Sequence, residues 1–219
     1  MNELWQPLLL SLRVASCATA LTALVAVPLA FFMARRTFAG KSALEALLTL
    51  PLVLPPTVVG YFIIVMLGAR GWLGSWLNRW FGYSIVFRFE GAVLAAAVVA
   101  LPLLYMPAKA AFASVERELE DIARLFGASW MQLFWHVSLP MARRGIASGL
   151  LLAFARALGE FGATLMVFGI QEHRRTLPVS IYLAYEQADS TSPWPAVVAL
   201  TLVSCGVILV YNRTMGRRD

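Results

Sequence analysis

The chain carries EDIARLFG at residues 120–127 and, nine residues later, VSLP at residues 137–140. Both stretches lie between strongly hydrophobic regions, and the charges of the first exclude it from a bilayer interior. Apolar side chains recur there at helical spacing, at Val115, Leu119, Ile122 and Phe126. The spacing predicts a short amphipathic helix whose apolar stripe needs a cover, either the chain's own bundle and lipid headgroups or another protein.

A fixed bend and a second helix follow. Gly127 stands where a helix ends and a positive φ is needed. Ser129 and Gln132 form a Ser-x-x-Gln capping box, which predicts a new helix start. Four apolar side chains share one side of that second helix: Trp130, Leu133, Phe134 and Val137. Pro140 is expected to stop it.

The composition is that of a membrane protein. Hydrophobic residues make up 60% of the 219 residues, charged residues 14%, and the mean hydropathy is +0.73. This predicts one transmembrane domain over residues 1–219 with no sizeable soluble domain. Cys17 and Cys205 both lie in hydrophobic stretches, so neither a disulfide framework nor a metal site is expected.

Five stretches are long and apolar enough to span a bilayer: 14–33, 47–67, 91–108, 146–168 and 195–211. The first is expected to be retained, because Arg35 and Arg36 follow it where a signal peptide would have a small-residue cleavage site. Eleven basic residues lie in or beside the connectors of one side, and six on the other. The richer set is Arg35, Arg36, Lys41, Lys109, Arg117, Arg124, Arg143, Arg144, Arg213, Arg217 and Arg218; the poorer set is Arg13, Arg70, Arg79, Arg88, Arg174 and Arg175.

The richer side is therefore expected to be cytoplasmic, with the N-terminus outside and the C-terminus inside. Most of the basic residues behind the net charge of +6 lie in these connectors beside apolar spans, so nucleic acid is not an expected partner. Aromatic side chains at helical spacing in 71–82 predict an interfacial helix on the outer side, with a sixth, re-entrant element as the alternative. The polar connector 171–194 is either a solvated loop or a gate or receptor contact, and Leu177-Pro178 predicts a short helix there, extending to Tyr185.

Two places inside the spans are candidates for the translocation path. Prolines interrupt the second span, and the broken backbone at Pro55, Pro56, Thr57 and Gly60 predicts a pore lining or hinge, against a simple packing kink. Arg156 and Glu160 lie four residues apart near the centre of the fourth span, where they are expected to share one helix face. An unpaired charge there costs about 2.5–3.5 kcal/mol, so a mutual ion pair is expected. That pair either fixes helix packing or lines the route and switches between gate states.

The stretch 120–140, called the polar island below, resembles the cytoplasmic loop of bacterial ABC importer permeases, whose pattern is Glu-Ala-Ala, three residues, Gly, nine residues, Ile, any residue, Leu-Pro. Here 121–123 stand for Glu-Ala-Ala and 137–140 close the pattern, with Asp, Ile and Val as substitutions. The resemblance implies that a loop over residues 114–144 enters a groove on a separate ATP-hydrolysing subunit. The coupling residues it implies are Glu120, Asp121, Ala123, Gly127, Val137, Leu139 and Pro140. Whether Glu120 or Asp121 does the work of the acid stays open.

Two further stretches resemble permeases for tetrahedral oxyanions: RALGEFGA at 156–163 and LPPTVVGY at 54–61. Among those permeases, the short length of the chain and GAVLAAA at 91–97 are most similar to the molybdate type. That resemblance implies an inner-membrane importer of molybdate or tungstate, with a sulfate or thiosulfate permease as the alternative. It further implies a homodimer with the pore between subunits and two ATPase subunits that carry the ATP and Mg²⁺. A periplasmic or lipid-anchored receptor would deliver the anion, and this chain itself would bind no cofactor.

The chain is not expected to be an enzyme. Gly40-Lys41-Ser42 is similar to the end of a phosphate-binding loop, but Arg35 stands where the first Gly is required. His-Glu-x-x-His and Gly-x-Ser-x-Gly are absent, and His136 and His173 fall on opposite sides of the membrane, so an intramembrane enzyme is a remote alternative. An ATP-independent channel is the other, although it would leave the apolar stripe of the island without a purpose.

Overall fold

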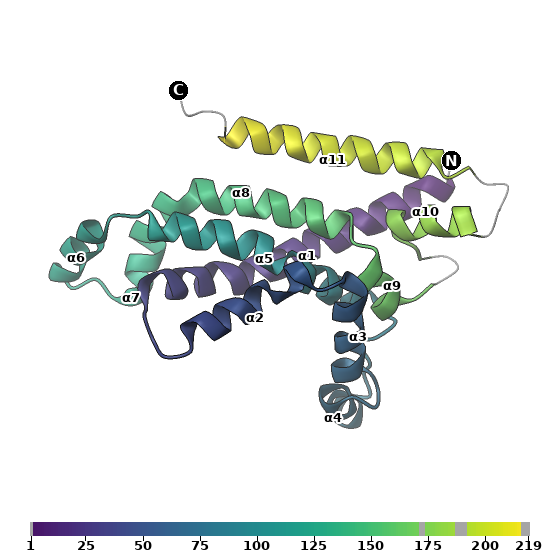
Figure 1. Cartoon of the computed structure of the whole chain (residues 1–219), viewed down its shortest axis with the longest axis horizontal. Helices are drawn as coiled ribbons and strands as arrows, with labels where there is room; N and C mark the ends of the chain where they lie inside the picture. Colours follow the sequence, from purple (N-terminus) through teal and green to yellow (C-terminus); the bar gives the residue numbers. More distant parts are fainter. Residues whose placement is uncertain (1, 171–173, 187–191, 216–219) are drawn as a thin grey trace.

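The computed structural model describes residues 2–170, 174–186 and 192–215, and the regular secondary structure within them is helical, which confirms the predicted all-α class. The elements are α1 (Asn2–Arg35), α2 (Lys41–Val53), α3 (Pro56–Leu67), α4 (Trp72–Phe81), α5 (Phe89–Ala113), α6 (Arg117–Leu125), α7 (Trp130–Gln132), the π-helical segment η1 (Leu133–Ser138), α8 (Leu139–Leu158), α9 (Gly162–Phe168), α10 (Leu177–Glu186) and α11 (Trp194–Met215). Figure 1 shows an elongated bundle with α6 and α7 at one end, α10 at the other, and α3 and α4 projecting to one side.

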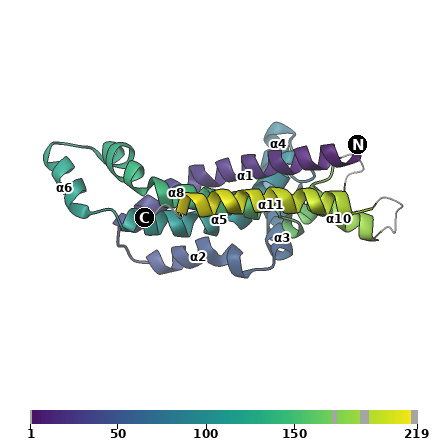
Figure 2. The ribbon, with the colours of Figure 1, turned by 90° about the horizontal axis from the view of Figure 1, so that it is seen from above.

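Helix α5 is the centre of the bundle and packs against α1 and α8. Small residues along α5 have no exposed surface, among them Ala92, Ala96 and Ala100, and they let the helices approach closely. The same holds across the α5–α8 contact, where a Cβ on Gly149 would lie 2.8 Å from a Leu104 methyl group. Figure 2 shows α1 and α2 on opposite sides of this central pair. Lys109 of α5 pairs with Glu45 of α2 at 2.6 Å and ties the outer helix to the core.

Three straight helices are long and apolar enough to cross a membrane: Leu4–Arg35, Phe89–Ala113 and Trp194–Thr214. Two bent pairs pass the same test together, Lys41–Val53 with Pro56–Leu67 at 116° and Trp130–Leu158 with Gly162–Phe168 at 60°. The count reaches the predicted five if each bent pair is one span. The first break lies at the predicted prolines, whereas the second falls after Leu158, where a continuous span was expected.

The expectation that Pro140 stops the second helix of the island is wrong. The chain stays helical from Trp130 to Leu158, with Pro140 in the first turn of α8. Proline is tolerated because the preceding turn widens to π-helical geometry over Leu133–Ser138, in which the N–H of Leu139 donates to the carbonyl of Phe134, five residues back. The wider turn avoids the clash that a proline ring makes with the carbonyl four residues earlier.

Two further helices lie where the sequence placed them. Helix α4 exposes its rings, with Trp72, Trp76 and Trp80 each more than half exposed, as an interfacial helix would; its depth in a membrane stays a prediction. Helix α10 starts at Leu177, whose N–H donates to Ser11 Oγ at 2.7 Å. The rest of the 171–194 connector lies partly outside the described residues, as do His173, Arg217 and Arg218.

Candidate coupling and translocation sites

The polar island forms a bent helical unit at one end of the bundle. Helix α6 ends in a Schellman motif: the N–H of Gly127 donates to Arg124 O at 2.8 Å and the N–H of Ala128 to Ala123 O at 3.1 Å. Gly127 has φ +83°, so the predicted left-handed glycine is present. After it, Ser129 Oγ accepts from the N–H of Gln132 while the Gln132 side chain accepts from the N–H of Ser129, which is the predicted capping box.

Glu120 is the acidic residue that joins this unit to the membrane helices. Its carboxylate is buried and lies 2.7 Å from a guanidinium nitrogen of Arg35, the last residue of α1. Ser138 Oγ of η1 donates to the same carboxylate at 2.6 Å, and Arg35 also donates to Val115 O at 3.1 Å. One buried cluster therefore connects α1, α6 and η1. Asp121, by contrast, is exposed and makes only a 3.4 Å contact with Arg124.

Arg35 was not among the predicted site residues. From the sequence it was one of eleven basic residues that set the topology, and nothing local marks it as buried. The signal that points to it is its position directly after an apolar span. An arginine one turn beyond that span would be solvated, whereas Arg35 is the final residue of α1 and its side chain is 4% exposed.

Aromatic rings fix the second helix of the unit to the end of α1. The ring of Phe31 lies 5.0 Å from that of Trp130 and 5.1 Å from that of Phe134, both with strongly inclined planes. Arg36 and Arg124 stand over the Trp130 ring from two different elements, at 5.0 and 5.4 Å from its centroid. Leu133 and Phe134 of the second helix are therefore covered by the chain's own bundle, whereas Trp130 stays 37% exposed.

The apolar side of α6 is not covered in the same way. Leu119 and Ile122 are 38% and 51% exposed, and Leu125 and Phe126 at the bend are 87% and 88% exposed. Ala123, Val137 and Leu139 are half-buried, and Pro140 is exposed. Of the predicted coupling residues, Glu120 is therefore the buried one. The exposed apolar tip at the bend, Leu125 and Phe126, was not among them.

Replacing Gly127 with leucine is expected to reduce transport severely while the protein stays in the membrane. A Cβ at this position meets nothing within 4 Å, so the effect comes from the positive φ alone, about 1–2 kcal/mol of backbone strain that turns the tip. Gly127→Asn is the matched control, because asparagine tolerates this conformation. Transport assays on both variants at equal membrane abundance measure it; normal transport by Gly127→Leu contradicts the bend as a functional element.

The two helix breaks of the membrane region pack against each other. A Cβ on Gly60 of α3 would lie 2.8 Å from Met166 Cβ and 3.0 Å from Ala163 Cα of α9. A Cβ on Gly162 would lie 3.3 Å from Pro56 Cβ and 3.2 Å from Thr57 Cγ2, both in the first turn of α3. Pro55 is the exposed residue that precedes α3. The predicted path residues of both spans, 55–60 and 156–160, therefore adjoin one junction.

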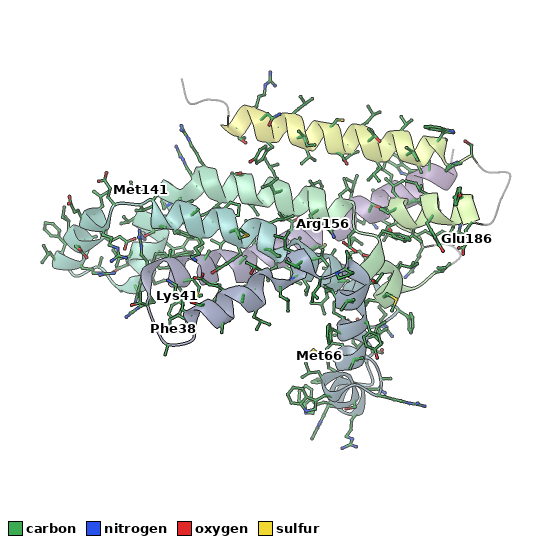
Figure 3. All side chains as sticks on the ribbon, viewed as in Figure 1. Phe38, Lys41, Met66, Met141, Arg156 and Glu186 are labelled. Atoms are coloured by element: carbon green, nitrogen blue, oxygen red, sulfur yellow. The ribbon has the colours of Figure 1, made fainter. Side chains whose placement is uncertain are left out.

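Arg156 and Glu160 form the predicted ion pair, with 2.6 Å between Arg156 Nη1 and Glu160 Oε2. The expectation that they share one helix face is corrected, because α8 ends at Leu158 and Glu160 lies in the break itself. Its second oxygen, Oε1, accepts from the N–H of Ala163 at 2.8 Å, in the first turn of α9. Figure 3 places Arg156 at the end of α8 that approaches α9. The Glu160 side chain is 1% exposed and that of Arg156 is 31% exposed.

A methyl group at Gly60 is expected to disrupt this junction. Gly60→Ala forces α3 away from α9, because the new Cβ meets backbone atoms and a Cβ at 3.0 Å or less, and overpacking of this kind costs about 1–3 kcal/mol. Gly206→Ala in α11 is the control, since nothing lies within 4 Å of its would-be Cβ. Thermal unfolding in detergent compares the two; an unchanged midpoint for Gly60→Ala contradicts the close packing of the breaks.

A helical membrane bundle that carries a bent polar unit on one end and a pair of broken helices inside is the architecture expected of a membrane transport component. The chain belongs to the family of binding-protein-dependent transport system inner membrane components, whose sequence profile matches residues 26–217. It is accordingly a multi-pass inner-membrane permease subunit and not an enzyme.

Individual relatives and structures agree with the family. The chain is 40% identical over 204 residues to a putative molybdenum transport system permease protein, YvgM, of Bacillus subtilis, covering 93% of this chain and 90% of that one. It is 39% identical over 214 residues to the molybdenum transport system permease protein ModB of Escherichia coli K12, covering 97% and 93%. A chain of a bacterial alginate ABC transporter, solved with an alginate-bound periplasmic protein, shares the fold with a TM-score of 0.71 at 18% identity, covering 97% of this chain and 78% of that one.

Proposed function

We propose that this chain is the permease of an ATP-driven importer that carries molybdate, and with it tungstate, into the cytoplasm. The observation that carries the proposal is its 39–41% identity, over nearly its whole length, to permeases named for molybdenum transport in bacteria. A sulfate permease, CysW of Synechocystis, is 34% identical over 209 residues and covers 91% of this chain, so sulfate is the second candidate cargo.

The buried Arg35–Glu120 pair supports a coupling role for the polar island. The permease would form a homodimer, and two ATPase subunits that carry ATP and Mg²⁺ would bind it. Each ATPase would contact the exposed apolar tip around Leu125 and Phe126 of one permease copy. Because the tip is joined to α1 through a buried ion pair and to α8 through a continuous helix, its displacement moves both membrane helices together. Such a rigid connection converts closure of the ATPases into a change of access, a two-state transition biased by nucleotide.

The orientation follows from the same assignment. The island must face the cytoplasm to meet the ATPases, which places the C-terminal end of α11 inside and the N-terminus outside. The uneven distribution of basic residues supports the same orientation. The opposite end of the bundle, with α10, then faces a periplasmic or lipid-anchored receptor that delivers the anion. This chain binds no cofactor of its own in this scheme.

Reconstitution tests the proposal. Proteoliposomes that contain the permease with its candidate ATPase and an oxyanion receptor are expected to accumulate labelled molybdate only when ATP is present on the ATPase side. Tungstate should compete at equal concentration, and sulfate only at a large excess. Equal competition by sulfate would assign the protein to the sulfate class. Molybdate flux without the ATPase would make it a channel.

A further inference from the structure

A basic crevice lies between α8 and α11, at the bundle end that carries the polar island. Its volume is about 1140 Å³, and its walls come from the first turns of α8 and the last turns of α11. The lining residues that matter here are Arg143, Arg144, Ala147, Leu209, Val210 and Arg213. Figure 3 marks Met141 at the start of α8, and Figure 1 shows the C-terminal end of α11 running beside that part of the helix.

The crevice has two chemical halves. Three arginines bring their positive charges to it from two helices, and none of them takes part in the four ion pairs formed within the described residues. Beside them, Leu209 and Val210 are 66% and 50% exposed, which leaves an apolar wall on the membrane side. The crevice therefore fits a ligand that has an anionic group at one end and hydrocarbon at the other.

The location of the crevice in the bundle favours the same kind of ligand. Helix α11 is apolar enough to span a membrane, yet no residue in its most hydrophobic stretch is buried by the rest of the chain. Its sides are therefore available to lipid, and a helix that spans the bilayer over Trp194–Thr214 would bring its last turns to the headgroup region. Basic pockets between membrane helices at this depth hold lipid headgroups. A guanidinium matches the oxygens of a phosphate in a two-pronged geometry.

We propose that this crevice is a binding site for an anionic phospholipid, whose phosphate lies among Arg143, Arg144 and Arg213 and whose acyl chains cover Leu209 and Val210. A small soluble anion would satisfy the arginines and leave that apolar wall uncovered. The lipid bridges two helices: its phosphate joins α8, which is continuous with the second helix of the polar island, to α11. The proposal does not depend on which anion is transported; only its assignment to the cytoplasmic leaflet rests on the proposed orientation.

Native mass spectrometry of the full-length permease, titrated with phosphatidylglycerol or phosphatidylcholine, tests the site. The protein is expected to retain phosphatidylglycerol in clear preference to phosphatidylcholine. Each neutralised arginine should weaken phosphatidylglycerol binding about fivefold, so the variant R143Q/R144Q/R213Q should lose about a hundredfold. The variant R70Q/R79Q/R117Q removes the same charge from exposed positions outside the crevice and should bind as the unchanged protein does. If the triple variant fails to fold, Arg213→Gln alone is measured against Arg117→Gln.

Several outcomes would overturn the site. Equal retention of the two lipids shows that the arginines provide no selectivity, and an equal loss in both triple variants shows that only net charge matters. An absence of bound lipid in a dimer whose copies crosslink through α11 assigns the crevice to the second copy. If molybdate displaces the lipid at concentrations at which sulfate does not, the arginines form a binding site for that soluble anion and not for a lipid. All of these are measured without transport, so a failed uptake assay leaves the result intact.

Discussion

Replacing Glu120 with alanine is expected to destabilise the permease by about 3–5 kcal/mol, because it leaves the buried guanidinium of Arg35 without its partner. Arg35→Ala should cost a similar amount for the reciprocal reason. The two side chains are 4% and 3% exposed, so water cannot replace the lost partner. Transport should fall with stability, since α6 is no longer attached to the end of α1. Thermal unfolding of the purified protein measures the loss of stability, the rate of proteolysis within 114–144 measures the detachment of α6, and an uptake assay measures transport.

The neighbouring acid provides the matched control. Asp121→Ala removes a carboxylate from the same helix, but Asp121 and its partner Arg124 are 66% and 47% exposed at a contact of 3.4 Å. An exposed pair of this kind is worth about 0–1 kcal/mol, so the unfolding midpoint should hardly change. Asp121→Ala can still reduce transport if the exposed carboxylate meets the ATPase. Equal destabilisation by the two substitutions would contradict the assignment of Glu120 as the anchoring acid.

Ser138→Ala separates the hydrogen bond from the charge pair. The hydroxyl donates to the Glu120 carboxylate at 2.6 Å and is fully buried, and its removal leaves the ion pair intact. A hydrogen bond to a charged group contributes about 1.5–3 kcal/mol. The loss should therefore fall below that of Glu120→Ala. A loss as large as that of Glu120→Ala would place the main anchoring energy in the hydroxyl.

The sequence predicted the parts of this molecule that depend on local chemistry. Apolar stretches of sufficient length gave the membrane helices, and the left-handed Gly127 followed from glycine's freedom at a helix end. The capping box at Ser129 was also predictable, because both of its hydrogen bonds join residues only three positions apart. The helical extension through Pro140 was not, because a wider turn that accommodates proline leaves no pattern in the side chains.

Contacts between distant residues set the limit of prediction for the site. Glu120 and Arg35 are 85 positions apart, and a basic residue after a span is already explained by membrane orientation. The break after Leu158 was missed for a different reason. Gly159 and Gly162 are also common where membrane helices pack closely, so they predicted packing and gave no indication of a 60° bend. Prolines mark the other break without this ambiguity.

The largest expected effect within the membrane belongs to Glu160. Glu160→Ala should lower the folded yield more than the double substitution Glu160→Ala with Arg156→Ala, because the single change leaves Arg156 unpaired at a cost of about 2.5–3.5 kcal/mol. Glu160→Gln should fall between them, since an amide oxygen can still accept from the N–H of Ala163 at the start of α9. Folded yield is measured by size-exclusion chromatography of membrane extracts. A double variant that folds worse than Glu160→Ala contradicts the pairing.

The same series separates a packing role from a transport role. Glu160 lies in the break beside the α3–α9 junction, and Arg156 keeps 31% of its side chain exposed. If the pair only fixes the bend, Glu160→Gln with Arg156→Met should restore folded yield and transport together, because the methionine stem preserves packing without a buried charge. If the charges line the route, the same variant should fold and yet lose uptake. We expect the second result, since a purely structural arginine in lipid would be shielded as fully as its partner, and Arg156 is not.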